Sequence, residues 1–331
     1  MSVDIGPLEI GLLEIDPEPG PGDAFIGFSR RRGTAVLPGQ VSVVPMLRSV
    51  NAQLYLAALR EGGSLPGIVE ADDLGTYVVK FVGAGQGRKT LVAEVVTGEL
   101  ARRLGFRVPE LVTVEIDASM ASCEPDEEVQ DLLRASGGTN LGVDFLPRSI
   151  GFDPAVHSVA GGTVAGGSVE GGPADRVMWL DAFVGNVDRS WRNPNLLMWH
   201  GDVWLIDHGA TLVFHHQWAG AASVVGKPVD LRDHVLAPFA GDLTRAHREL
   251  APLVTEELLT EVVALVPQVW LDDEPGFDDA AAVRRAYVEH LSRRLARATD
   301  WLPASTAPLA SKGSKGSTGS TGSTGSKEDA S

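Results

Sequence analysis

Cysteine is almost absent from this chain of 331 residues, in which Cys123 is the single one. One thiol cannot build an intrachain disulfide framework, and it cannot supply the several thiolates of a cysteine-based zinc site. Proteins without disulfides are typical of reducing compartments, so the sequence predicts a cytoplasmic protein. Residues 1–20 contain acids and prolines and lack a basic segment ahead of an apolar one, so we expect no secretory signal peptide.

Long apolar runs and an excess of positive charge are also missing. No apolar run approaches the roughly 20 residues that a membrane-spanning helix needs, so we expect no membrane association. The chain has 28 Lys and Arg against 44 Asp and Glu, a net charge of −16. Sequence-independent binding of nucleic acids depends on Lys and Arg that neutralise phosphates. We therefore expect no direct nucleic-acid binding. The hydrophobic fraction of 44% is still ordinary for a soluble globular protein and sufficient for a sizeable core.

The composition divides the chain into four parts. Residues 1–45, rich in Gly, Pro and acids, are expected to form a loosely ordered N-terminal extension, and Met46 is a candidate alternative start. Residues 304–331 are a Gly/Ser/Thr-rich tail that cannot bury enough apolar surface to fold, so we expect disorder there. Between them we place a first lobe at 46–147 and a second at 148–303.

The first lobe reads as strands and turns around one helix. Residues 68–71 and 76–82 favour strands, separated by turn-forming residues, whereas 50–59 fits a strand or a helix. This predicts an antiparallel meander. Apolar residues spaced at helical intervals predict a helix over 89–104 that ends at Gly105. A strand over 111–116 follows, and then a helix near 125–136 with acidic residues in its first turn, where the helix dipole favours them.

The second lobe is mainly helical. After an expected loop at 151–172, the sequence predicts a helix at 175–184 and a hairpin of two strands, 196–199 and 203–206. The clearest later helices are predicted at 255–266 and 278–298. Together the two parts predict an α+β, two-lobed fold: a small antiparallel sheet with a helix, and a larger helical lobe.

The segment from Asn186 to Gly209, NVDRSWRNPNLLMWHGDVWLIDHG, carries the strongest chemical signal. It places Asp188 on a loop, an amide at Asn193, then a hairpin, then Asp207. Phosphoryl transfer uses one carboxylate to orient the attacking hydroxyl, and an amide and a second carboxylate to hold Mg²⁺ against ATP. Taken singly, each of these residues is more often a loop cap or a strand end than a catalytic residue. Their combination favours Asp188 as the base, and Asn193 and Asp207 as metal ligands.

Lys80 lies in the apolar strand 76–82, where a buried ammonium needs an anionic partner. The phosphates of ATP would serve, with Glu94 on the following helix fixing the lysine as a strand–helix ion pair. The alternative is an edge-strand lysine whose amine reaches water. Upstream, Gly62 and Gly63 form a turn whose backbone could cover the phosphates, and Ser64 could add a hydroxyl.

These segments resemble the HipA-type kinases, in a short stand-alone form. The resemblance rests on REGGSLPGIVEADDLGTYVVKF, LVAEVVTGELARRLGFRVPE, NVDRSWRNPNLL and WLIDHG, and covers about residues 46–216. It implies a two-lobed kinase fold related to the phosphoinositide lipid kinases, and transfer of the ATP γ-phosphate to protein Ser or Thr. It also implies Asp188 as catalytic acid–base, Asn193 and Asp207 as Mg²⁺ ligands, and Lys80 as the ATP lysine. We further expect Phe145, in GVDFLP, beside the adenine.

The chain departs from the family in two respects. Ser190 stands where the family commonly has His, which bears on rate or acceptor choice. Residues 1–45 are too short to be the extra N-terminal subdomain of better-known members. No toxin role or antitoxin-like partner is therefore carried over, and the acceptor is expected to be a protein or small-molecule hydroxyl.

Other interpretations remain open at this point. GAGQGRKT at 83–90 resembles a phosphate loop, but its spacing differs from GxxxxGK, and it would make Lys89 rather than Lys80 essential. The chain could also be a catalytically weak nucleotide-binding module or a small-metabolite kinase. The clustered histidines 200, 208, 215 and 216 are expected to have turn, core and surface roles rather than to form a zinc site.

Overall fold

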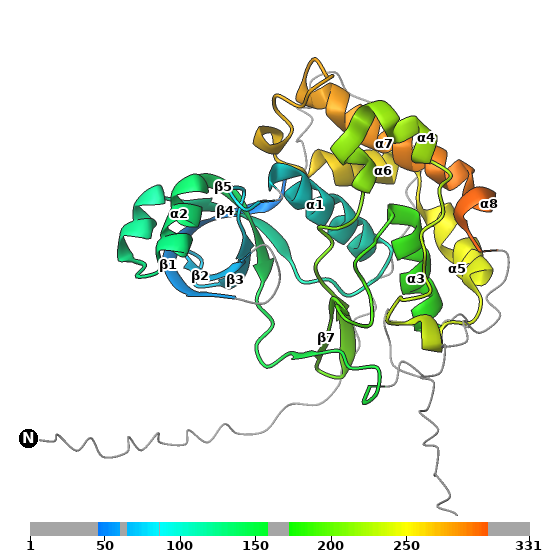
Figure 1. Cartoon of the computed structure of the whole chain (residues 1–331), viewed down its shortest axis with the longest axis horizontal. Coiled ribbons are helices and arrows are strands. Elements are labelled where there is room, and N and C mark those ends of the chain that lie inside the picture. The colour runs from blue at the N-terminus through cyan, green and yellow to red at the C-terminus, as the bar shows by residue number, and fades with distance from the viewer. Residues whose placement is uncertain (1–45, 60–64, 86, 158–171, 304–331) are drawn as a thin grey trace, which may run out of the picture. The chain divides into compact units, whose positions relative to one another are not determined.

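The structure, a computed structural model, describes residues 46–59, 65–85, 87–157 and 172–303 (Figure 1). The predictions for residues 1–45, for Gly62, Gly63 and Ser64, for most of the 151–172 loop and for the tail lie outside these ranges. The described strands are β1 (Arg48–Ala58), β2 (Gly67–Ala71), β3 (Thr76–Lys80), β4 (Leu111–Ile116), β5 (Gly138–Asp144), β6 (Ile150–Gly151), β7 (Leu196–Trp199) and β8 (Asp202–Leu205). The described α-helices are α1 (Gly87–Arg103), α2 (Glu127–Ala135), α3 (Pro173–Val184), α4 (Ala221–Val224), α5 (Leu243–Leu250), α6 (Glu256–Ala264), α7 (Ala280–Ala296) and α8 (Ala298–Trp301).

Strands β1 to β5 close into a barrel in the order β1-β2-β3-β5-β4, which Figure 1 shows as a ring with α2 beside it. Four neighbouring pairs are antiparallel, and β1 pairs with β4 in parallel, with Arg48 opposite Val112. The purely antiparallel sheet predicted from the sequence is therefore wrong for this pair. A closed ring of five strands cannot alternate direction throughout, so at least one pair must run parallel.

Several elements match their sequence patterns. The ambiguous segment 50–59 lies in β1 as far as Ala58, and β4 and β7 have the predicted bounds. The β7–β8 hairpin turns through His200 and Gly201, whose φ angles of 50° and 83° suit such a two-residue turn. Helix α3 begins with Pro173 and ends at Gly185, which takes a left-handed φ of 73°. The mixed helix and sheet content of the α+β prediction is confirmed.

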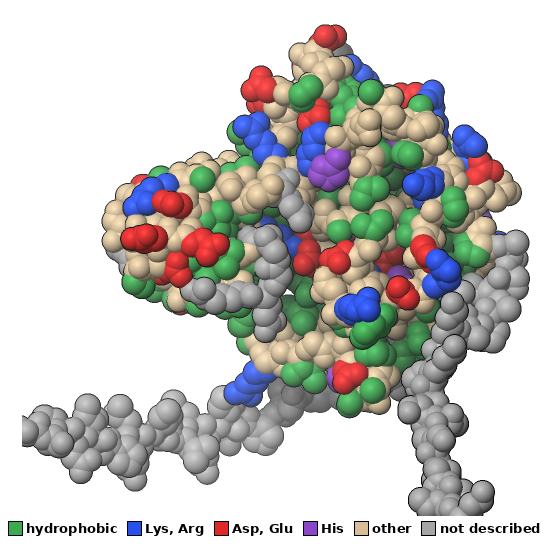
Figure 2. All heavy atoms as spheres, in the orientation of Figure 1, with side chains coloured by type: hydrophobic (Ala, Val, Ile, Leu, Met, Phe, Trp, Pro, Cys, Tyr) green, Lys and Arg blue, Asp and Glu red, His purple; other side chains and the backbone are tan. Residues whose placement is uncertain are grey.

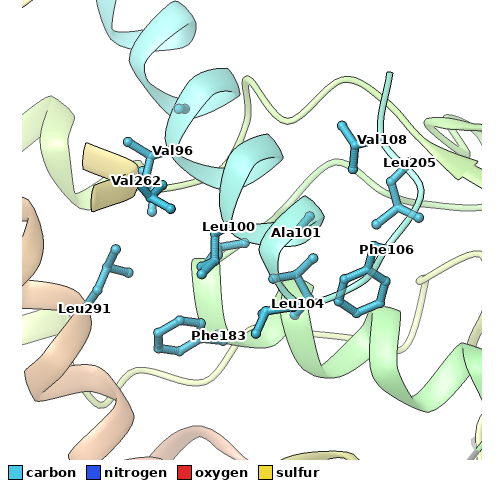
Figure 3. Packing of buried hydrophobic residues seen from close by; sticks show 14 of the residues in the cluster. Val96, Leu100, Ala101, Leu104, Phe106, Val108, Phe183, Leu205, Val262 and Leu291 are labelled. Carbon is cyan, nitrogen blue, oxygen red and sulfur yellow. The ribbon is translucent and has the colours of Figure 1, made fainter. Parts of the chain in front are cut away.

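Two hydrophobic clusters hold the described chain together. The smaller one fills the barrel and includes Val50, Val79 and Val112, together with Leu133 of α2. The larger one joins the helices, and helix α1 belongs to it. In Figure 3, Val96 and Leu100 of α1, and Leu104 directly after it, point toward side chains of α3, α6 and α7, which are Phe183, Val262 and Leu291. The helix predicted at 89–104 thus packs among helices that come later in the chain.

Figure 2 shows Lys and Arg side chains scattered among Asp and Glu on the face in view, rather than gathered in one patch. Within the described ranges, no helix combines the length and apolar character that crossing a bilayer requires.

Candidate active site

Lys80, the last residue of β3, lies at the centre of a three-residue charged cluster. Its ammonium contacts Oε1 of Glu94 on α1 and lies 2.7 Å from Oδ1 of Asp207, which follows β8. Only 11% of the Lys80 side chain and 2% of the Glu94 side chain are exposed, whereas 47% of Asp207 is exposed. The cluster therefore joins the barrel, α1 and the hairpin, and offers one carboxylate to solvent.

The second oxygen of Glu94 fixes the segment after Asp207. Oε2 accepts a hydrogen bond of 2.9 Å from the backbone N–H of His208. At Gly209, a Cβ atom would lie 2.5 Å from the Thr90 side chain and 3.0 Å from Oε1 of Glu94. Only glycine allows the backbone after Asp207 to approach α1 so closely.

The charges of the cluster are set by burial and by one another. Burial acts to lower the pKa of Lys80, but the Glu94 and Asp207 carboxylates outweigh it and raise this pKa. Burial likewise opposes ionisation of Asp207, yet the adjacent Lys80 ammonium lowers its pKa to about 2. At neutral pH the site presents a cation and an ionised carboxylate side by side, which is the charge pattern that phosphates with a divalent cation require.

Asp188 lies on the loop after α3, and two amides hold its carboxylate. Its Oδ2 accepts hydrogen bonds of 2.8 Å from Nδ2 of Asn193 and 3.0 Å from Nδ2 of Asn195. The loop turns back between Ser190 and Asn193, whose backbones exchange two hydrogen bonds, and Oγ of Ser190 accepts a further one from the Asn193 N–H. Ser190 thus closes the loop at the position where it departs from the family pattern.

Arg189 is a fully buried hub beneath this loop. Its Nε lies 2.7 Å from Oδ2 of Asp181 on α3, and both side chains have no exposed surface. The same carboxylate oxygen is 2.9 Å from Nε2 of His234, and Oδ1 accepts from Asn186. Burial alone would raise the pKa of Asp181, but the Arg189 guanidinium and its other partners lower it well below its usual range. The buried Asp181 carboxylate is stable in its ionised form because each of its two oxygens has a partner.

The same guanidinium connects the two halves of the site. Nη1 of Arg189 donates to the carbonyl of Asn195, and Nη2 lies 3.4 Å from Nδ1 of His208. The carbonyl of Asn195 also accepts from the N–H of Ile206, directly before Asp207. The segment that carries Asp188 and the segment that carries Asp207 are therefore tied to each other through shared hydrogen bonds.

Comparison with known proteins places this site in a family. A family model described as HipA-like kinase matches residues 55–302, about three quarters of the chain. The chain belongs to the HipA-like kinase family. The matched range includes every predicted site residue of this kinase, and the predicted relation to phosphoinositide lipid kinases stays a prediction.

Solved structures show more distant similarities to this HipA-like kinase. The crystal structure of the Helicobacter pylori proinflammatory kinase CtkA is 12% identical, with coverage of 78% of this chain and 95% of that one, at a TM-score of 0.42. The Golgi casein kinase is also 12% identical, covering 77% of this chain and 74% of that one, at a TM-score of 0.33. A structure of the Golgi casein kinase with Mn and ADP bound covers 76% and 73%, with a TM-score of 0.35. No curated protein sequence matches the chain.

The remaining predicted site residues of this HipA-like kinase are placed as follows. Phe145 directly follows β5, its N–H donates to the Thr76 carbonyl, and its side chain is exposed. Lys89, which the phosphate-loop alternative would require, donates to the His215 carbonyl at 2.6 Å and pairs with Glu274 at 2.7 Å. Its amine is thus engaged by the helical part, which weighs against that alternative. Gly62 and Gly63 lie outside the described residues.

The hub residues were not predicted from the sequence, although one signal was present. Asp181 interrupts the apolar run Val177–Val184, and a charge at that point in a buried helix must have a partner. The nearest cations along the sequence are Arg176, before it, and Arg189, after it. Neither His234 nor the role of Asn195 has a comparable signal, because His234 joins the hub from a distant segment and Asn195 reads as part of a turn.

The residues present fit a nucleotide with a divalent cation. Asn193 uses its Nδ2 on Asp188, which leaves its amide oxygen for a metal, and Asp207 uses Oδ1 on Lys80, with Oδ2 remaining. Magnesium prefers oxygen ligands and is commonly held by one or two carboxylates with substrate phosphates. Among the described residues, no group of three or more His, Cys, Asp or Glu side chains could hold a metal ion.

Proposed function

We propose that this HipA-like kinase transfers the γ-phosphoryl group of ATP, with Mg²⁺, to the hydroxyl of a protein Ser or Thr. The observation that carries the proposal is Lys80, which bridges Glu94 and Asp207. The hub ties that cluster to the Asp188 loop. The barrel and the helical part would act as two lobes of a cytoplasmic kinase, with ATP between Lys80 and Asp207.

Each side chain has a defined task in this reaction. Lys80, positioned by Glu94, would neutralise the α- and β-phosphates, and Asn193 and Asp207 would hold Mg²⁺, which offsets the charge on the phosphate oxygens. Asp188 would accept the hydroxyl proton as the acceptor oxygen bonds to the γ-phosphorus and the bond to the β–γ bridging oxygen breaks. ADP leaves with that oxygen's electron pair, so charge and protons balance.

The position of Asp188 supports turnover over simple nucleotide binding. Two amides bond its Oδ2, and the N–H of Asp188 is itself held by Oδ1 of Asn186 at 2.9 Å. An oriented, partly exposed carboxylate is the requirement for a base that meets an acceptor hydroxyl.

Titration with ATP and Mg²⁺ separates the two carboxylate roles. Asp207→Ala should lose metal-dependent ATP binding, because a ligand of the metal is removed. Asp188→Ala should keep ATP affinity within a few fold while losing at least about 100-fold in phosphoryl transfer, as expected for removal of a general base. Isothermal calorimetry of both variants beside wild type measures this, and equal ATP affinity of Asp207→Ala and wild type would contradict the metal assignment.

A further inference from the structure

A pocket of about 470 Å³ opens beside the segment that carries Asp188. The end of α3, the segment from Val213 to Val229 and helix α7 line it, and most of the lining side chains are apolar. Val187, directly before Asp188, is 64% exposed, and Val213, six residues after Asp207, is 46% exposed, and both line this pocket. Apolar side chains that stay exposed around a concave surface indicate a binding site.

The floor of this pocket is built rigidly. Arg294 is buried and donates from its guanidinium to the carbonyls of Ala182, Phe183, Val225 and Lys227, at 2.6–3.0 Å. The rings of His290 and Phe214 stack with centroids 3.5 Å apart and an interplanar angle of 15°. Because these contacts tie the end of α3 and the Phe214–Lys227 segment to α7, these walls of the pocket are formed without a ligand, and a guest loses little affinity to their reorganisation.

The pocket is also tied to the proposed chemistry. The N–H of Leu212, in the segment after Asp207, donates 2.9 Å to the carbonyl of Val184, in the helix that leads to Asp188. An extended chain advances about 3.3–3.6 Å per residue. In a peptide whose hydroxyl meets Asp188, a side chain about one to three residues from that hydroxyl would therefore lie over Val187.

Charge at the rim favours a particular peptide. Lys227 is exposed at the pocket edge, and no carboxylate of the described residues forms an ion pair with it. Asp230, the acid of the rim, is already paired with Arg232. On a chain with net charge −16, this free ammonium is complementary to an acidic residue of the guest.

We propose that this pocket is the specificity site for a polypeptide acceptor, holding a large apolar side chain about one to three residues from the target hydroxyl, with an acidic residue near Lys227. The proposal rests on the proposed function for the place of the hydroxyl. It goes beyond that function because it specifies which acceptors bind.

Photo-crosslinking tests the pocket without relying on turnover. The probes are glycine-rich peptides with one Ser, one Glu and one photo-leucine, placed in turn at each position from −3 to +3 relative to the Ser. We expect crosslinks to residues 183–187 or 213–230 from one or two of these positions, mapped by mass spectrometry. A matching leucine peptide should compete roughly tenfold better than its glycine counterpart, as burial of a leucine side chain predicts.

Matched variants show whether the crosslinks report this pocket. Val213→Trp fills it and should remove them, whereas Val156→Trp, at an exposed valine outside it, should leave them unchanged. Thermal unfolding of both variants checks that they fold. Crosslinks that map elsewhere in wild type, or equal competition by the leucine and glycine peptides, overturn the proposal.

The same peptides, incubated with ATP and Mg²⁺, separate this proposal from the proposed function. Crosslinking in the pocket without phosphorylation of the Ser would support the pocket and contradict the kinase assignment for peptides. Equal phosphorylation of the leucine peptide and its glycine counterpart would support the kinase assignment and contradict the proposed role of the pocket.

Discussion

Gly209 follows Asp207 and His208 at the point where the backbone passes α1. The Cβ of an alanine there would lie 2.5 Å from Thr90 and 3.0 Å from the Glu94 carboxylate, closer than atoms normally approach. Either α1 or the segment of Asp207 would have to move. The Lys80 cluster depends on both.

We therefore predict that Gly209→Ala lowers ATP affinity at least tenfold and destabilises the fold by about 1–3 kcal/mol, the usual cost of overpacking. Calorimetric ATP titration and chemical unfolding measure the two effects. Gly151→Ala is the matched control, because a Cβ there meets nothing within 4 Å. Unchanged ATP affinity in Gly209→Ala would show that the close approach to α1 does not matter for the site.

At the scale of elements, the position of α1 explains how Glu94 is held. All residues from Leu91 to Ala101 are buried, and they pack against helices of the second half of the chain. Glu94 is thus fixed by the helical core, whereas Lys80 comes from the barrel. The ion pair between Lys80 and Glu94 therefore connects the barrel directly to the helical part of the chain.

The Asp181–Arg189 pair joins α3 to the loop that carries Asp188. Removing one partner leaves a buried, uncompensated charge, so Asp181→Ala should destabilise the protein by about 3–5 kcal/mol and reduce turnover. In the double variant Asp181→Ala/Arg189→Met neither charge remains, and the loss should be smaller than the sum of the single losses. Urea unfolding of the single and double variants measures this.

The exposed pair Glu289–Arg293 is the control for this cycle, since surface pairs contribute little. If the losses of Asp181→Ala and Arg189→Met simply added, the two side chains would not act as a pair.

The sequence predicted the elements with regular patterns better than those shaped by neighbours. Strand β5 was missed because Gly138 and Gly142 break its pattern. Gly142 has a physical reason to be glycine: a Cβ there would lie 2.6 Å from Val114, inside the barrel. The parallel pairing of β1 with β4 follows from ring closure, which no local pattern encodes. The residues that we assign to phosphoryl transfer could be proposed from the sequence because that reaction needs particular residue types in a particular order. The hub that contacts them could not be proposed in this way.

At the scale of the whole molecule, buried histidines should set the acid limit of stability. Burial lowers the pKa of His208 and His215 to about 3 and that of His290 to about 4. In the unfolded chain each titrates near 6.5. Above about pH 6.5 these histidines are neutral in both the folded and the unfolded chain, so their burial costs no stability through protonation. Below that value the unfolded state binds more protons, and stability falls until each folded pKa is reached.

We predict that the melting temperature falls between pH 6.5 and 4.5, and that His290→Gln makes this decline shallower. Over this range, one such histidine lowers the free energy of unfolding by about 1.4 kcal/mol for each pH unit. Melting curves from pH 7.5 to 4.5 measure it, with His200→Asn, in the exposed turn, as the control. Parallel curves for wild type and His290→Gln would show that this histidine is not kept neutral by the fold.

Phosphoryl transfer to a hydroxyl is tested most directly by intact mass spectrometry of the whole protein. Purified protein is incubated with ATP and Mg²⁺, alone and with proteins of a cell lysate, beside Asp188→Ala. We predict phosphate with wild type and not with Asp188→Ala, seen as added mass on the chain itself or as labelled Ser or Thr in a lysate protein. Equal phosphate with both proteins, or label only on small molecules, would contradict it.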